Sequence, residues 1–244
     1  MHIMKEYDLA VIGSGFYSLG LASAGGRSVV IDPHFLLDPD FAGTFSGFTP
    51  TPCEEYSSES ETLRSIIERS ECMTGGRFNV PALESCLAEY AGEIGTDVLL
   101  GAYTVKIEPP SDIHVITLHT SAGIIEIGAK TVVKRQRHLP DTVNLLVRGA
   151  SFTLDEDEVD GLSLSLSDAY SRSDRILSVR APLPMENNAL RARAIRAASR
   201  VLRAKDAKII ECAPLGFYSA DAPFAGGPLA DFERGVFSWR EMNV

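Results

Sequence analysis

The residues with the clearest chemical meaning are two glycines that follow a short apolar run. In "DLAVIGSG" four apolar residues lead into Gly13 and Gly15, which is how a strand enters a phosphate-binding turn. The first glycine of such a turn permits the bend, the second lets a diphosphate approach the backbone, and the third lets helix and strand pack closely. Here the third position is Ser18. The pattern predicts a cofactor-binding turn at Gly13, Ser14, Gly15, Phe16 and Ser18, with the diphosphate held by N–H groups at the helix start.

A carboxylate at the end of the next strand completes this pattern. Asp32 ends "VVID", 19 residues after Gly13, where an acid usually accepts hydrogen bonds from a ribose. The spacing is about one turn of roughly 3.6 residues shorter than in longer versions, which leaves the helix face in register. His34 beside it could move protons near neutral pH, or be an ordinary structural histidine. The alternative for the turn is that its glycines serve only close packing.

Composition limits the classes of partner. The chain has 33 acidic against 23 basic residues and a net charge of -10, which argues against general nucleic-acid binding. It has neither a secretory-type apolar segment nor a run of roughly 20 apolar residues that could span a membrane. We therefore expect a soluble, cytoplasmic protein. The four cysteines are scattered, without a CxxC pair or histidines at metal-ligand spacing, so we expect free thiols rather than a zinc or disulfide framework, and no metal.

Several stretches resemble the FAD-dependent oxidoreductases of the glutathione-reductase-like type. "YDLAVIGSG" with "VVID" is similar to their N-terminal FAD motif, and "GGRFNVPALESCLAEYAGEIGTDVLLGAYTVKIE" and "GIIEIGAKTVV" resemble later parts of their FAD domain. The resemblance implies FAD as the cofactor and an oxidoreductase, or a subunit of one, acting on a small organic substrate. It also implies that main-chain atoms near Val105 meet the adenine. A valine at this position is equally well explained as sheet core.

The fold expected from these elements is α/β. We predict a Rossmann-type FAD/NAD(P)-binding parallel sheet with an antiparallel β excursion around residues 98–133, and a short divergent C-terminal region. Residues 1–150 form the predicted dinucleotide-binding domain, 151–176 an acidic, Ser-rich linker or flap, and 177–244 a small C-terminal α/β region. Helices are expected from about Ser60, over 79–95 and over 186–206, and strands within 96–110, 112–123 and 124–134. The aromatic, Gly-rich tail after residue 214 shows no strong period.

The chain departs from the resemblance in two places. The family's small Ala-Thr-Gly turn is replaced by "KRQRH" at 134–138, whose bulky cations would crowd the cofactor. "TVNLLVRG", ending at Gly149, resembles a late strand that delivers a glycine to the diphosphate, and only about 95 residues follow it. The chain is therefore a minimal oxidoreductase, one subunit of a split enzyme, or a non-catalytic interaction subunit with a vestigial or nucleotide-only site.

Surface features suggest a partner. Four arginines spaced three or four residues apart form one stripe on the helix over 186–206, namely Arg193, Arg196, Arg200 and Arg203. This stripe could hold an acidic partner or phosphate, or be a solvated face paired with the acidic residues 155–160. With the aromatic tail, it leads us to expect a homo- or hetero-oligomer. No catalytic residue can be assigned from the sequence.

Overall fold

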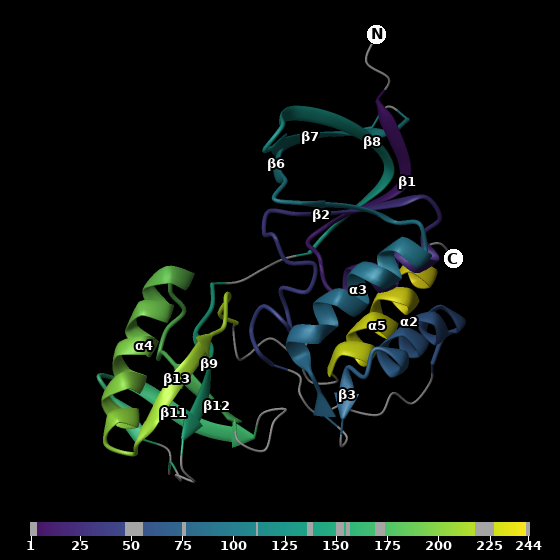
Figure 1. Cartoon of the computed structure of the whole chain (residues 1–244). Coiled ribbons are helices and arrows are strands. Elements are labelled where there is room, and N and C mark those ends of the chain that lie inside the picture. The colour runs from purple at the N-terminus through teal and green to yellow at the C-terminus, as the bar shows by residue number, and fades with distance from the viewer. Residues whose placement is uncertain are drawn as a thin grey trace.

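The computed structural model describes residues 4–46, 56–74, 77–110, 112–135, 139–149, 154, 157–168, 174–217 and 227–242. The chain forms two units, each built on its own β-sheet (Figure 1). Within the described residues, no helix is both long and apolar enough to cross a membrane.

The first unit contains a six-stranded sheet in the order β5-β2-β1-β8-β7-β6. Its strands are β1 (Lys5–Ile12), β2 (Ser28–Asp32), β5 (Asp97–Leu100), β6 (Tyr103–Glu108), β7 (His114–Thr120) and β8 (Gly123–Lys134). β1 runs parallel to β2 and β8, β2 runs parallel to β5, and β6, β7 and β8 form an antiparallel meander. The predicted α/β fold, a parallel sheet with an antiparallel excursion, is confirmed.

One boundary in this sheet differs from the sequence prediction. Residues 97–108, expected as one strand, form the two strands β5 and β6. The chain turns between them at Gly101, which has a positive φ of 67°, a conformation that glycine adopts at little cost. The ring of Phe35 occupies the space where a side chain at Gly101 would lie.

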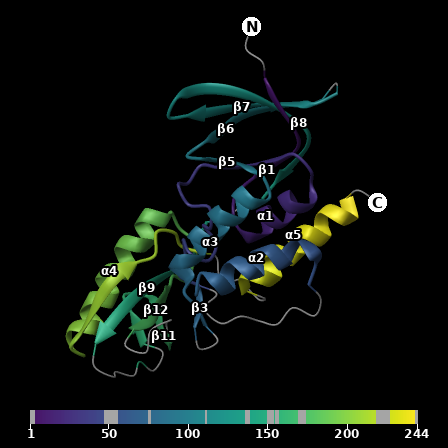
Figure 2. The ribbon, with the colours of Figure 1, turned by 45° about the vertical axis from the view of Figure 1, so that its right-hand side comes forward.

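Four helices lie on one side of this sheet and share an apolar core with β1 and β2 (Figure 2). They are α1 (Phe16–Ala24), α2 (Ser58–Arg69), α3 (Val80–Glu93) and α5 (Gly227–Met242), and the short strands β3 (Met73–Thr74) and β4 (Arg77–Phe78) connect α2 to α3. The opposite face packs against the meander through a second apolar cluster that includes Ile31, Ile116 and Leu118.

The helix α5 was not expected, because the tail shows no strong period. Its apolar positions Leu229, Phe232, Val236 and Trp239 all contact the core of the first unit. Gly20 of α1 faces the backbone of Phe232, and Gly235 of α5 faces that of Tyr17, so closely that a Cβ at either glycine would overlap a carbonyl oxygen. The first unit is therefore built from both ends of the chain.

The second unit is an antiparallel sheet in the order β10-β11-β12-β9-β13, with α4 (Asn187–Arg203) on one face. Its strands are β9 (Thr142–Gly149), β10 (Asp157–Val159), β11 (Leu162–Asp168), β12 (Asp174–Arg180) and β13 (Ala207–Cys212). The apolar side of α4, including Leu190, Ala194 and Leu202, is fully buried against the sheet.

Two sequence predictions need correction here. The described part of 151–176 is not a linker, because it contains β10, β11 and the start of β12, and buries Leu162 and Leu164. Their apolar contacts outweigh the acidic, Ser-rich composition. The strand "TVNLLVRG" is β9, which pairs with β12 and β13. Its Gly149 lies against Ala207, so it delivers no glycine to the first sheet.

Candidate functional site

The predicted turn lies at the carboxyl end of β1, where ligands of open α/β sheets usually bind. Gly13 and Gly15 have φ values of 105° and 123°, which disfavour any residue with a Cβ. Ser18 Oγ donates a 2.5 Å hydrogen bond to the carbonyl oxygen of Gly13, and Gly13 N donates one of 2.8 Å to Ile31 O. The third small residue therefore ties the turn to the helix that follows it.

Asp32 organises the turn from the neighbouring strand. Its carboxylate is fully buried, and Oδ2 accepts hydrogen bonds from Ser14 N at 2.7 Å and Ser14 Oγ at 2.8 Å. The other oxygen accepts a bond from His34 N at 2.8 Å and lies 2.9 Å from His34 Nδ1. Both oxygens are thus engaged within the chain. A ribose contact at Asp32 stays a prediction.

The other two predicted cofactor residues lie in different surroundings. Phe16 is fully buried, and its ring packs edge-on against Phe41 with centroids 5.6 Å apart. Only its backbone is therefore left for a ligand. Val105 lies on β6, the edge strand of the sheet, with 64% of its surface exposed. The sheet-core explanation of Val105 is therefore wrong, while its main-chain contact with adenine stays a prediction.

A charged cluster, made of Arg135, Asp40 and Asp231, covers the turn. Arg135 directly follows β8, and its backbone N donates to Ile12 O at 2.9 Å. Its guanidinium donates to Ser14 O at 3.2 Å, to the carboxylate of Asp40, and to Asp231 at 3.4 Å. A Cβ at Gly15 would lie 2.9 Å from Arg135 Nη1 and would overlap Asp40. The side chains of this chain therefore fill the space directly above the second glycine.

This cluster is charged and mostly buried. Burial opposes the charge of Arg135, but the carboxylates of Asp40 and Asp231 outweigh it and raise the pKa of the guanidinium. Burial raises the pKa of Asp231 even though Arg135 and Arg234 lie beside it. Asp38, which lies on the loop over 33–46, is fully buried next to Asp40, and these two causes raise its pKa to about 8. Three carboxyl groups thus gather near one arginine.

The cationic segment at 134–138 explains part of this arrangement. Lys134 ends β8 and Arg135 crosses the turn, with its Cβ only 2.9 Å from where a Cβ of Gly13 would lie. The bulky cations of this segment are evident in the sequence, but their partners are not. Residues 136–138, among them His138, and Cys53 lie outside the described residues.

The loop over 33–46 connects the turn to the second unit. Glu84 of α3 accepts hydrogen bonds from Leu37 N at 2.6 Å and Asp38 N at 2.7 Å, which fixes the start of the loop. At its other end, Asn144 Nδ2 of β9 donates to Thr44 O and Phe45 O at 3.0 and 2.9 Å. The sheet face that carries Asn144, opposite α4, therefore lies toward the loop.

The arginine stripe is a solvated helix face. Arg200 Nη1 donates to both carboxylate oxygens of Asp160 at 2.7 and 2.5 Å, and Arg193 donates to Asp160 O at 3.3 Å. The predicted pairing with the acidic residues at 155–160 is confirmed at Asp160. A role of the stripe in holding a partner stays a prediction.

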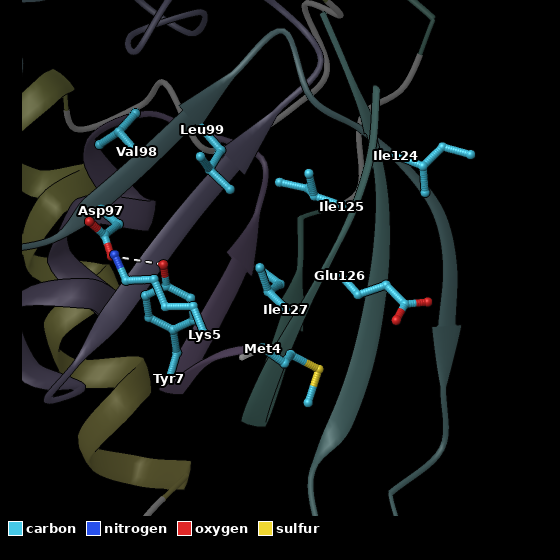
Figure 3. A pocket seen from close by; sticks show the side chains of 10 residues that line it. All are labelled: Met4, Lys5, Tyr7, Asp97, Val98, Leu99, Ile124, Ile125, Glu126 and Ile127. Atoms are coloured by element: carbon cyan, nitrogen blue, oxygen red, sulfur yellow. Dashed lines mark hydrogen bonds and ion pairs between the residues drawn. The ribbon is translucent and has the colours of Figure 1, made fainter. Parts of the chain in front are cut away.

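A separate cavity of about 520 Å³ is lined by the amino-terminal parts of β1, β5 and β8 (Figure 3). Its walls are mainly apolar, from Met4, Val98, Leu99 and the 124–127 segment of β8. At one side Lys5 pairs with Asp97 at 2.5 Å, and Tyr7 Oη donates to Asp97 at 2.8 Å. None of its lining residues belongs to the glycine turn, which lies at the carboxyl end of β1, where ligands of such sheets usually bind.

No protein-family model and no curated protein sequence match this chain. Solved structures match it in fold. A flavoprotein/dehydrogenase from Cytophaga hutchinsonii shares 12% identity at a TM-score of 0.59, over 98% of this chain and 79% of its own. CabE, an aromatic hydroxylase from angucycline biosynthesis, shares 14% at 0.54, over 85% of this chain and 51% of its own.

Aklavinone-11 hydroxylase, solved in a ternary complex with FAD and aklavinone, shares 13% identity at a TM-score of 0.53, over 87% of this chain and 53% of its own. This chain has the fold of these three solved structures. It spans about half the length of the two hydroxylases. At 12–14% identity the likeness concerns the fold alone.

Proposed function

We propose that this chain is an FAD-binding oxidoreductase, or one subunit of such an enzyme, that acts on a small organic substrate. The observation that carries the proposal is the turn at Gly13 and Gly15, with positive φ at both glycines, at the carboxyl end of β1 in a flavoprotein fold. The closer assignment to the glutathione-reductase-like type rests on the sequence resemblance, and a cytoplasmic location belongs to the same proposal.

The backbone of the turn fits a diphosphate, because its two glycines leave room for close approach and α1 begins directly behind them. The side chains above the turn do not leave that room free. For FAD to bind, the carboxylate of Asp40 has to leave Gly15, which releases the guanidinium of Arg135 to pair with the diphosphate. When bound, FAD would supply the electron-carrying group, while this chain provides position and shelter from water.

The surface of the second unit favours a small polar substrate in this proposal. The face of its sheet opposite α4 carries exposed Ser163, Ser165 and Ser167 on β11, and the same face meets the 33–46 loop through Asn144. Hydroxyl groups can donate or accept hydrogen bonds. A substrate held between this face and the turn would contact both units.

The alternative is a non-catalytic interaction subunit with a vestigial or nucleotide-only site. Two observations favour it. Both carboxylate oxygens of Asp32 accept hydrogen bonds from this chain, and Asp40 with Arg135 covers the turn. The chain also spans only about half of each hydroxylase. We therefore also propose that a partner, a second copy or another subunit, completes the active site.

The test starts with the absorbance of the purified protein and a titration with FAD, NAD and ADP. Flavin bands or saturable FAD binding support the enzyme. Gly15→Val should lower FAD affinity at least tenfold, because a branched side chain takes the space of the diphosphate. Gly161→Val is the matched control, since Gly161 also has a positive φ, 71°, but lies in open space in the turn between β10 and β11.

Three results would contradict the proposal. The site assignment fails if Gly15→Val keeps full FAD affinity, or if Gly161→Val loses as much. If the wild-type protein binds none of FAD, NAD and ADP, the proposed cofactor is wrong. If the protein is strictly monomeric by sedimentation and has full turnover on its own, the proposed partner is not needed.

A further inference from the structure

Two cysteines that are 14 positions apart in the chain meet in the core of the first unit. Cys72 lies between α2 and β3, Cys86 lies on α3, and their Sγ atoms are 2.7 Å apart. Both residues are buried in the cluster beneath the four helices. A disulfide bond has a length of about 2.05 Å, so the two sulfur atoms already lie close to bonding distance.

Two hydrogen bonds hold the backbone of Cys72. Cys72 N donates to Ile67 O of α2 at 3.2 Å, and Cys72 O accepts from Asn79 N, at the start of α3, at 2.7 Å. Cys86 is held by the second turn of α3. The two sulfur atoms are therefore brought together by the segment that follows α2 and by α3.

The surroundings suit a dithiol better than a metal or a nucleophile. Structural zinc needs four ligands, and the described residues contain no group of three or more His, Cys, Asp or Glu that could hold a metal. Burial and the neighbouring thiol raise the pKa of Cys86 to about 12. Because the thiolate is the form that reacts with alkylating agents and with peroxide, both reactions should be slow while the protein stays folded.

We propose that Cys72 and Cys86 form a reversible disulfide, a redox modification site within the core of the first unit. The oxidant is a peroxide. One thiol is oxidised by hydrogen peroxide to a sulfenic acid with release of one water, and the second thiol then attacks it, forming the S–S bond and releasing a second water. Two thiols lose two electrons and two protons, and the O–O bond breaks. A thiol or phosphine reductant restores both thiols.

The disulfide would join the end of α2 to α3, the helix that positions the loop above the turn. Glu84, two residues before Cys86, accepts the hydrogen bonds of Leu37 N and Asp38 N. Oxidation would therefore restrain the helix that anchors this loop. The inference stands independently of the proposed function, because it concerns the packing of the first unit alone.

The experiment compares the full-length protein after incubation with hydrogen peroxide and after reduction with a phosphine. We expect the oxidised protein to lose the mass of two hydrogen atoms, and peptide mapping to find Cys72 joined to Cys86. The crosslink should raise the melting temperature by about 5–10 °C, because it constrains the unfolded chain. Reduction should reverse both changes.

Cys212→Ala is the matched control, since Cys212 is half-buried on β13 and apart from the pair. It should keep the crosslink and the rise in melting temperature, whereas Cys72→Ala and Cys86→Ala should lose both. Peptide mapping of the wild type needs no variant, so a variant that fails to fold does not block the test. The proposal is overturned if peroxide leaves the pair as free thiols, if the bond joins either cysteine to another one, or if the crosslinked protein melts no higher.

Discussion

The two units use arginine in opposite ways. In the first unit Arg135 lies beneath the 33–46 loop with 13% of its side chain exposed, against Asp40 and Asp231. In the second unit Arg200 pairs with Asp160 while 64% of its side chain is exposed. A buried arginine that loses its partners, or carboxylates that lose their arginine, leave charge in a poorly solvated place, whereas an exposed pair exchanges easily for water. The comparison separates residues that hold the site together from residues that only cover a helix.

The largest expected effect is at Arg135. Arg135→Met should destabilise the protein by about 3–5 kcal/mol, because Asp40 and Asp231 are left without their shared cation. Urea unfolding at neutral pH measures the change. If Arg135→Met lost no more stability than the substitution of an exposed arginine, the cluster would be solvated and the difference between the two units would disappear.

The next largest effect is expected where α1 packs closely on α5. Gly20→Ala should cost about 2–3 kcal/mol, since its Cβ overlaps the carbonyl oxygen of Phe232. Gly92→Ala is the control on α3, where nothing lies within 4 Å. There the better helix propensity of alanine should stabilise by up to about 1 kcal/mol. If both variants shift the unfolding midpoint in the same direction relative to the wild type, the packing of α5 on α1 is contradicted.

The buried carboxyl of Asp38 predicts a pH dependence. Its folded-state pKa, about 8, lies above the ordinary value, which is about 4. Between these two pH values, Asp38 therefore keeps its proton in the folded protein but has released it in the unfolded chain. This contribution to stability is complete below about pH 4 and is lost as the pH rises toward 8.

Asp38→Asn isolates this contribution. The difference in unfolding free energy between wild type and variant should change in favour of the variant as the pH rises from 5 to about 8. Denaturant midpoints at several pH values in one buffer series measure it. If the difference is independent of pH, Asp38 is ionised in the folded protein, and Arg135 neutralises more charge than we infer.

The smallest effect should be at the arginine stripe. Arg200→Gln removes the pair with Asp160, but solvent already screens both groups. We expect the unfolding midpoint to stay within the scatter of replicate measurements. A clear loss of stability in the isolated protein would mean that the stripe does more than cover α4.

The sequence allowed prediction of elements with strong local signals. The strand and turn at 8–15, the helices that became α3 and α4, and the meander all carry their period or their turn residues locally. The helix α5 also has a helical period, at Leu229, Phe232, Val236 and Trp239, but Gly235 and the preceding Gly-Pro obscured it. The strand β11 alternates Leu162, Leu164 and Leu166 with serines, a period of two that its acidic surroundings concealed.

The site could be predicted only in part. Gly13, Gly15, Ser18 and Asp32 lie within one βαβ unit, so a local pattern places them together. Arg135, by contrast, meets residues 95 and 96 positions away. Only the pairing of β8 with β1 and the packing of α5 on α1 bring them to the turn. Local spacing contains no information on such contacts.

The contact between α1 and α5 also sets the order in which the first unit can mature during synthesis. The ribosome completes α1 early, yet the apolar surface under Phe232 and Val236 stays uncovered until α5, at 227–242, has been translated. Contacts of such long sequence separation form late and slowly, and exposed apolar surface in nascent chains favours aggregation. The closing step in the folding of the first unit therefore waits until α5 has left the ribosome.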